Sequence, residues 1–221
     1  MTTVLQFGPV LVHLDRLLWG LVQTLEYAVL SIIFGTIIGT LGAVGRSFGP
    51  RWVSVIVAAY VELIRNTPLL IQLYIVYFSL PLIGMKFSPG TSAIIALSIH
   101  LGAYATEIIR AGVESIPVGQ IEAAKSLGLS RYRIIRHVVL APAVRAVYPS
   151  LSAQFILQLM GTSIIGAIAA EELTAIANNL VMQTFRSFEV YIVVAVIYFV
   201  VVQSASLLLA GLGRLMFRWK Q

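Results

Sequence analysis

Charged side chains are scarce in this sequence, and two pairs of them interrupt its apolar segments. Glu62 and Arg65 are three residues apart, as are Glu107 and Arg110. Residues at this spacing share one helix face, so each carboxylate can neutralise the neighbouring guanidinium in a medium of low dielectric constant. Glu107 can alternatively meet a polar solute, because Tyr104 lies close to it on the same helix. Both readings involve ion pairing and hydrogen bonding, without cleavage of a covalent bond.

Residue sets for catalysis do not come together on any predicted helix. The sequence has no G-x-x-x-x-G-K-S/T phosphate-binding loop, so the chain is not expected to hydrolyse ATP itself. It has no cysteine, and no second His follows close to His100, so a metal site is not expected. We predict that His100 makes a contact in the core or between helices. We expect no catalytic residue and no cofactor on this chain.

The segment from Glu122 to Gly128 reads Glu-Ala-Ala-Lys-Ser-Leu-Gly and lies in the most basic loop of the chain. Pro117 suits the first turn of a helix, where its missing N–H is no loss. Glu122 follows about one turn later, near the positive end of the helix dipole. We expect Ala123 and Ala124 to leave a smooth surface, and Gly128 to end the helix in a left-handed conformation.

A second short helix is expected to follow, with three basic residues, Arg131, Arg133 and Arg136. The residues alone leave two readings of this helix-turn-helix segment. It can lie on lipid headgroups as an ordinary interfacial element, or it can be a docking element that a soluble partner grips.

The composition is that of a membrane protein. Of 221 residues, 59% are hydrophobic and 11% are charged, whereas soluble domains carry about 25% charged residues. Five apolar runs each reach or approach the roughly 20 residues that a helix needs to cross the hydrocarbon core. They are Leu17–Val44, Val53–Phe78, Thr91–Ile109, Val138–Ile168 and Val190–Leu212. We predict an all-α bundle with five spans, in which the long fourth run adds a re-entrant or surface piece.

The positive charges gather in the loops on one side of these spans. The formal net charge is +6, and with an external N-terminus the inner loops hold eleven basic residues against three outside, an asymmetry that keeps loops in the cytoplasm. The inner residues are Arg46, Arg51, Arg110, Lys125, Arg131, Arg133, Arg136, Arg145, Arg214, Arg218 and Lys220, and the outer ones are Arg16, Lys86 and Arg186. We predict an external N-terminus and a cytoplasmic C-terminus. Nucleic acid is not expected as a partner, because topology already explains the basic residues.

Two features within the runs concern helix packing. Gly35 and Gly39 form a small-x-x-x-small pair, which lets helix backbones approach closely. Packing within one subunit and contact with a second subunit explain this pair equally well. Pro68 is expected to kink the second span, and Asn66 and Thr67 are expected to satisfy the carbonyl groups that it frees.

The loop resembles the E-A-A-x3-G segment of permease subunits in bacterial ABC importers, with Glu122, Ala123, Ala124 and Gly128 matching. In that family nine residues separate the glycine from an I-x-L-P sequence. Val138 and Leu140 stand at the Ile and Leu positions here, and the proline comes one residue late, at Pro142. We expect the shift to alter how the next helix begins and to leave the docking surface unchanged.

Three further motifs are similar to the polar amino-acid branch of this family, the MetI-like histidine and glutamine type. Glu62–Gln72 resembles its E-x-x-R-x-T-P-L-x-x-Q segment, Tyr104–Arg110 its Y-x-x-E-I-x-R segment, and Phe185–Tyr191 its F-R-x-F-E-x-Y segment. The four motifs keep their order and spacing from about Gly20 to Leu215, which makes them more specific together than singly.

The resemblance implies a five-span MetI-like bundle in a single permease domain, residues 1–221, with a cytoplasmic coupling loop at 112–137. It implies a role in ATPase coupling for Glu122, Ala123, Ala124, Gly128 and Pro142. The implied partners are two ATP-binding subunits that hold ATP and Mg²⁺, a second permease subunit, an extracytoplasmic solute-binding protein and the lipid of the bacterial inner membrane.

The candidate substrate path is less polar than the resemblance implies. After the fourth span the family commonly has K-D/N-T-S-L, where this chain has Met160-Gly161-Thr162-Ser163-Ile164. A zwitterionic amino acid favours opposite charges, so we expect a heterodimer whose other permease carries the charged groups. A homodimer with a less charged solute is the alternative. The candidate path residues are Thr67, Glu107, Gln154, Gln158, Thr162 and Ser163, of which Gln154 and Gln158 share one helix face and offer neutral hydrogen bonds.

The sequence therefore favours a transmembrane permease subunit of an ATP-driven importer for a polar amino acid or a related small solute. Such a subunit would form half of the translocation path and would not be an enzyme. The alternative is a free-standing helical channel or secondary carrier without an ATPase, which would not need a coupling loop.

Overall fold

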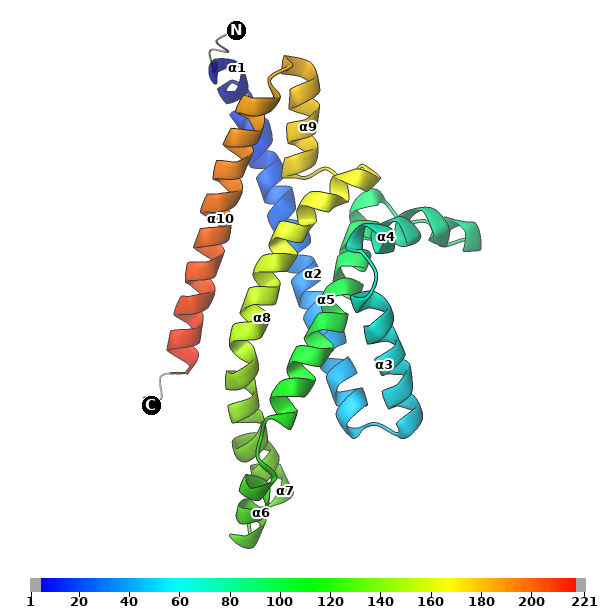
Figure 1. Cartoon of the computed structure of the whole chain (residues 1–221), viewed down its shortest axis with the longest axis vertical. Coiled ribbons are helices and arrows are strands. Elements are labelled where there is room, and N and C mark those ends of the chain that lie inside the picture. Colours follow the sequence, from blue (N-terminus) through cyan, green and yellow to red (C-terminus); the bar gives the residue numbers. More distant parts are fainter. Residues whose placement is uncertain (1–4, 218–221) are drawn as a thin grey trace.

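The computed structural model describes residues 5–217, and every regular element in this part of the chain is helical (Figure 1). The long helices are α2 (Leu14–Phe48), α3 (Arg51–Arg65), α5 (Pro89–Glu114), α8 (Ala141–Gly161), α9 (Leu173–Thr184) and α10 (Ser187–Met216). The shorter ones are α1 (Gly8–Leu11), α4 (Leu69–Tyr74), η1 (Ile75–Ser79), η2 (Leu80–Ile83), α6 (Val118–Ser126), α7 (Arg131–Arg133), η3 (Ile134–Leu140) and η4 (Thr162–Ile168). The all-α prediction is confirmed. Arg218 and Lys220, counted above as inner residues, lie outside the described part.

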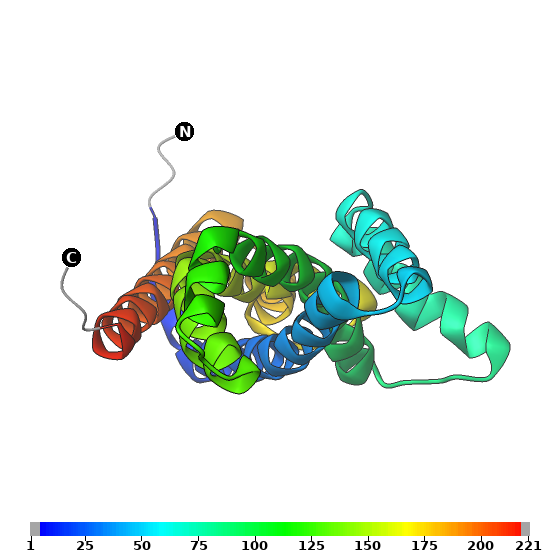
Figure 2. The same ribbon diagram turned by 90° about the horizontal axis from the view of Figure 1, so that it is seen from below.

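The described helices fit four or five crossings of a membrane. Four stretches are long and apolar enough to cross, namely Leu14–Phe48, Pro89–Glu114, Arg131–Ile168 and Ser187–Met216. The fifth is broken, because Arg51–Arg65 and Leu69–Ile83 pass the same test together but are bent by 109°. The second predicted run is therefore two separate segments where we expected one kinked span, and Figure 2 shows them beside the main bundle.

The break between α3 and α4 follows from Pro68, which lacks the N–H that would bond to the carbonyl of Ile64. As expected, Asn66 Nδ2 and Thr67 Oγ1 donate to the carbonyls four residues before them, at 2.9 and 2.8 Å. The buried Gln72 was not expected to take part, yet its Nε2 donates to the freed Ile64 carbonyl at 2.8 Å. An unsatisfied carbonyl in hydrocarbon costs several kcal/mol, so these side chains make the break tolerable.

Gln72 also ties the break to α5. Its Oε1 lies 3.1 Å from Nδ1 of His100, whose ring centre is 5.0 Å from that of Tyr104. The predicted interhelical contact of His100 is confirmed. The direction of the α4 segment is thereby fixed against the helix at the centre of the bundle.

α5 packs along α2 through small side chains. A Cβ atom at Gly35 would lie 2.8 Å from the Cβ of Leu101, and one at Gly39 would lie 2.3 Å from the Cβ of Ala105, closer than any side chain allows. The two glycines therefore serve packing within the subunit, and contact with a second subunit is the wrong reading for them. The buried positions of α2 recur every three or four residues, at Leu17, Gly20, Thr24, Ala28, Ser31, Gly35, Gly39 and Ala43.

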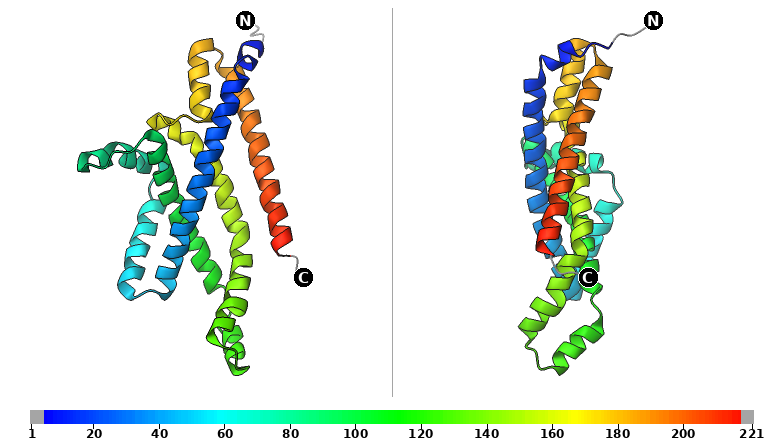
Figure 3. Two further views of the ribbon diagram at one scale, coloured as in Figure 1. Left: turned by 180° about the vertical axis from the view of Figure 1, so that it is seen from behind. Right: turned by 90° about the vertical axis from the view of Figure 1, so that its left-hand side faces the viewer.

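α9 lies at the end of the bundle seen uppermost in Figure 3, and Glu172, the residue before it, fixes it to α10. Its buried carboxylate accepts hydrogen bonds from the backbone N–H groups of Thr174 and Ala175, both at 2.7 Å, and from the Tyr198 hydroxyl of α10 at 3.1 Å. The first residue of α9 donates its N–H to Thr24 Oγ1 of α2 at 3.1 Å. Burial raises the pKa of the Glu172 carboxyl, and the backbone donors oppose that rise.

Replacing Gly39 by alanine is expected to lower the free energy of unfolding by about 1–3 kcal/mol, because the new methyl group would overlap Ala105 and force the two helices apart. Thermal unfolding of the purified protein in detergent measures the effect. Gly211→Ala in α10 is the matched control, since no atom lies within 4 Å of its added Cβ. Equal unfolding temperatures for the two variants would contradict this account of the α2–α5 contact.

Candidate functional site

The predicted coupling loop protrudes from one end of the bundle. α6 lies beyond the α2–α3 turn, at the lower end of Figure 1. Pro117 precedes its first residue, and Glu122 and Ala123 are exposed. Ala124 is only 4% exposed, and α6 packs against η3. The prediction that both alanines form an open surface therefore needs correction, because Ala124 lies on the packed side of the helix.

Gly128 ends α6 as predicted, in the left-handed region at φ 71°. The N–H of Gly128 donates to the carbonyl of Lys125 at 2.9 Å, and the N–H of Leu129 donates to the carbonyl of Ala124 at 3.2 Å. This pair of bonds is a Schellman motif, which satisfies the last carbonyls of a helix and reverses the chain. A side chain at position 128 would strain this turn, because residues other than glycine rarely adopt this backbone conformation.

After the loop the chain returns to the bundle, and no new helix begins at Pro142. α7, η3 and α8 follow one another directly, so the expected second short helix is the first part of the stretch Arg131–Ile168. η3 has π-helical hydrogen bonding and ends immediately before α8, whose first turn holds Pro142. The wider π turn accommodates the missing N–H and the ring of Pro142. The late proline therefore changes the local winding of this helix. The helix itself begins earlier in the sequence, at Arg131.

An ion-pair cluster lies near the end of α5 that leads into the loop. Glu107 accepts hydrogen bonds from Arg110 at 2.9 Å and from Arg46 of α2, and Arg110 also bonds Glu114 at 2.5 Å. The predicted Glu107–Arg110 pair is confirmed. Arg46 was predicted only as a topology signal. It lies seven residues after Gly39, on the face of α2 that contacts α5, and this spacing could have identified it.

Glu62 and Arg65 do not form the predicted pair. The Glu62 carboxylate accepts from Asn66 Nδ2 at 3.0 Å. The guanidinium carbon of Arg65 lies 5.5 Å from the centre of the Tyr104 ring on α5, a cation–π distance. Arg65 therefore interacts with Tyr104 across the helix interface and not with Glu62 on its own helix.

A cavity of about 450 Å³ adjoins this contact and brings polar groups of three helices together. Arg65 of α3, Glu107 of α5 and Ser150 of α8 line it. Of the candidate path residues, Glu107 is the one that borders this cavity.

The other candidate path residues lie farther along the bundle. Gln158 is 2% exposed, and its Nε2 donates to Ser31 Oγ at 3.1 Å and to the carbonyl of Leu97 at 2.8 Å. These bonds join α2, α5 and α8. Since Glu107 is ten residues beyond Leu97, the levels of Gln158 and Glu107 are about 15 Å apart along α5.

Thr162 and Ser163 lie still farther from the loop, in η4, and donate to backbone carbonyls three residues earlier. Thr67 lies at the α3–α4 break, and Gln154 is partly exposed one turn before Gln158. The six candidates are therefore spread along the bundle at several levels. Among residues 5–217, no three His, Asp or Glu side chains are placed to hold a metal ion.

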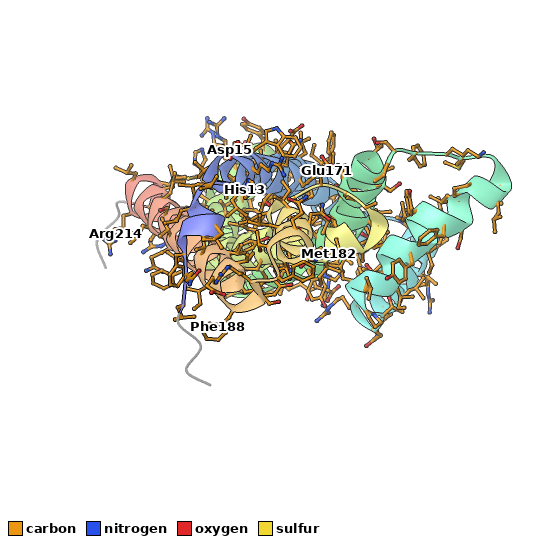
Figure 4. The ribbon with its side chains drawn as sticks, turned by 90° about the horizontal axis from the view of Figure 1, so that it is seen from above. His13, Asp15, Glu171, Met182, Phe188 and Arg214 are labelled. Atoms are coloured by element: carbon orange, nitrogen blue, oxygen red, sulfur yellow. The ribbon has the colours of Figure 1, made fainter. Side chains whose placement is uncertain are left out.

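The opposite end of the bundle has a polar hollow that sequence reasoning missed. A cavity of about 600 Å³ between α2 and α9 is lined by residues of both charges, including Asp15, Arg16 and Glu171, together with His13 and Trp19. Figure 4 views this end and labels His13, Asp15 and Glu171. No short motif marks these positions, because α2 and the start of α9 are far apart in the sequence.

A bundle of apolar spans with polar groups at its helix junctions, and an exposed helical loop at one end, defines a membrane-embedded transport subunit. Comparison with known proteins gives the family. Residues 31–218 match the model of the family described as "Binding-protein-dependent transport system inner membrane component". The chain belongs to this family, and the alternative of a free-standing channel or carrier is set aside.

Individual relatives agree. The chain is 36% identical over 202 residues to the glutamine transport system permease protein GlnP of Escherichia coli K12, covering 90% of this chain and 92% of that protein. It is 35% identical over 189 residues to the L-cystine transport system permease protein TcyB of Bacillus subtilis, covering 85% and 81%.

Solved structures are similar over nearly the whole chain. A crystal structure of an amino acid ABC transporter with histidines contains a chain that superposes with a TM-score of 0.89 at 33% identity, covering 96% of this chain and 99% of that one. An inward-facing structure of the MetNI methionine ABC transporter has a TM-score of 0.77 at 21% identity, covering 92% and 97%, and this match concerns the fold alone.

Proposed function

We propose that this permease serves an importer for a polar amino acid or a related small solute and forms half of its translocation path. The names of the relatives support this solute class, since they are called glutamine and cystine permeases and the neighbouring structure is called an amino acid transporter. In this proposal ATP and Mg²⁺ are bound by two separate ATPase subunits. A solute-binding protein delivers the solute at the end of the bundle that holds α9.

The exposed α6 with its Schellman turn is the observation that supports coupling to the ATPases. Glu122 and Ala123 face outward, and Ala124 holds α6 against η3. The turn at Gly128 fixes the angle between α6 and the helix that begins at Arg131, so the two move as one body. Pro142 would contribute through the π turn that joins this helix to α8.

Replacing Gly128 by leucine is expected to abolish uptake and to prevent ATPase subunits from co-purifying with the permease, because the side chain forces the left-handed turn open. Uptake of radiolabelled glutamine by cells, with immunoblotting of the membrane fraction, measures both transport and permease level. Gly84→Leu is the matched control, since Gly84 also has a positive φ, 88°, with no atom near its added Cβ, and lies outside the loop. Normal uptake by the Gly128 variant would contradict the coupling role.

We propose that the loop faces the cytoplasm, as the charge asymmetry predicts. Ser88 immediately precedes α5, and Lys125 lies on α6 just after α5 ends, so the two residues flank one membrane span. Both are exposed.

Single cysteines at the two positions are expected to differ in labelling by an impermeant thiol reagent. In intact cells Ser88→Cys should react and Lys125→Cys should not, and both should react after the cells are lysed. The absence of native cysteine removes background labelling. Reaction of Lys125→Cys in intact cells would show the opposite orientation.

We propose that the second permease subunit is a different chain. Met160 and Gly161 offer no charge where the family commonly has one, and Gln158 is engaged in helix packing, so this half is poor in groups for a zwitterion. A mass measurement of the intact importer is expected to show one copy of this chain beside another permease. Two copies and no other permease would contradict the proposal.

A further inference from the structure

Two adjoining grooves run between α10 and the helix formed by η3 and α8. The larger has a volume of about 620 Å³ and the smaller about 550 Å³, and both are lined by Arg145 and Phe217. Arg214 borders the larger groove, and Arg136 borders the smaller one. Both grooves lie toward the end of the bundle that holds the coupling loop, where α10 ends and α8 begins.

The basic residues of these grooves have no acidic partner in the described part of the chain. Arg46, Arg110 and Arg186 each form an ion pair, whereas none of the carboxylates in residues 5–217 lies within 4.0 Å of Arg145 or Arg214. α8, η3 and the part of α10 after Glu189 contain no acidic residue at all. The grooves therefore have a net positive charge that the described part of the subunit does not neutralise.

The walls between these charges are apolar and firmly held. The Tyr148 hydroxyl donates to the carbonyl of Leu209 at 2.6 Å, and the Tyr148 ring meets that of Phe217 edge-on at 5.3 Å. A Cβ at Gly213 would lie 2.7 Å from the Tyr148 ring, so the two helices touch there. Beyond this contact, Ile156 and Leu209 line a slot between the helices.

α10 is the candidate span least covered by the rest of the subunit. Only 6% of its apolar 18-residue stretch is buried, compared with 56% of the corresponding stretch of α5. Leu207, Leu208, Leu212 and Leu215 are among its exposed side chains. A slot that lies beside such an exposed helix is accessible to the acyl chains of lipids.

We propose that the larger groove binds one anionic phospholipid of the inner leaflet. Its phosphate lies between Arg145 and Arg214, and an acyl chain fills the slot beside Ile156 and Leu209. Basic pockets between membrane helices on the cytoplasmic side suit anionic headgroups, and each arginine near such a surface favours them. The assignment to the inner leaflet rests on the proposed orientation of the loop, whereas the binding itself does not.

The test is lipid binding by the purified, delipidated importer complex, measured by native mass spectrometry with phosphatidylglycerol or phosphatidylcholine. We expect the wild-type complex to prefer phosphatidylglycerol. The double variant Arg145→Gln/Arg214→Gln is expected to lose about tenfold or more in apparent affinity. The charge-keeping variant Arg145→Lys/Arg214→Lys is expected to retain binding. Ala210→Trp, which fills the slot without changing charge, is expected to displace the lipid.

The matched control is Arg51→Gln/Arg131→Gln, which removes two exposed arginines at the same end of the bundle but outside both grooves. An equal loss of phosphatidylglycerol in this control would overturn the proposal, because general surface charge would then explain the binding. Displacement of the lipid by soluble glycerol phosphate at equal concentration would also overturn the proposal. The site would then bind the phosphate group alone and would not require an acyl chain. Unfolding temperatures check that each variant is folded. Neither outcome depends on uptake, so a failed coupling role stays distinguishable from a failed lipid site.

Discussion

The close approach of α2 and α5 is the contact on which the other helices depend. α5 is the most buried of the candidate spans, and α3, α4 and α8 all pack on it. Between helices in lipid there is no hydrophobic driving force, so close van der Waals contact and hydrogen bonds have to hold them together. The glycine face of α2 supplies the first of these, and Gln158, which bonds both helices from α8, supplies the second.

Polar side chains inside the bundle are used mainly as joints between helices. Gln72 fixes the α3–α4 break, Glu107 joins α2 to the end of α5, and Glu172 joins α9 to α10. Each joint satisfies a buried or partly buried polar group that would otherwise be costly. The arginines between α8 and α10 differ from these joints, because no carboxylate within residues 5–217 pairs with Arg145 or Arg214.

The sequence predicted features that depend on local spacing. The apolar runs, the left-handed Gly128, the Glu107–Arg110 pair and the side chains capping the carbonyls before Pro68 all concern residues within a few turns of each other. Two of the errors involve neighbours on other helices. Arg65 meets Tyr104 across a helix interface, and Ala124 is buried where α6 packs on η3. The polar hollow between α2 and α9 is likewise made by helices that no pattern of spacing connects.

The uninterrupted stretch from Arg131 to Ile168 has a mechanical consequence. Its 38 residues correspond to roughly 55 Å of helix, with the loop at one end and η4 at the other. η4 packs against α4 and α9, and Gln158 bonds the stretch to α2 and α5. Nearer the loop, Tyr148 joins it to α10. A force applied to the loop would therefore reach the α8–α10 contact first, then the α2–α5 contact, and the broken span beside η4 last.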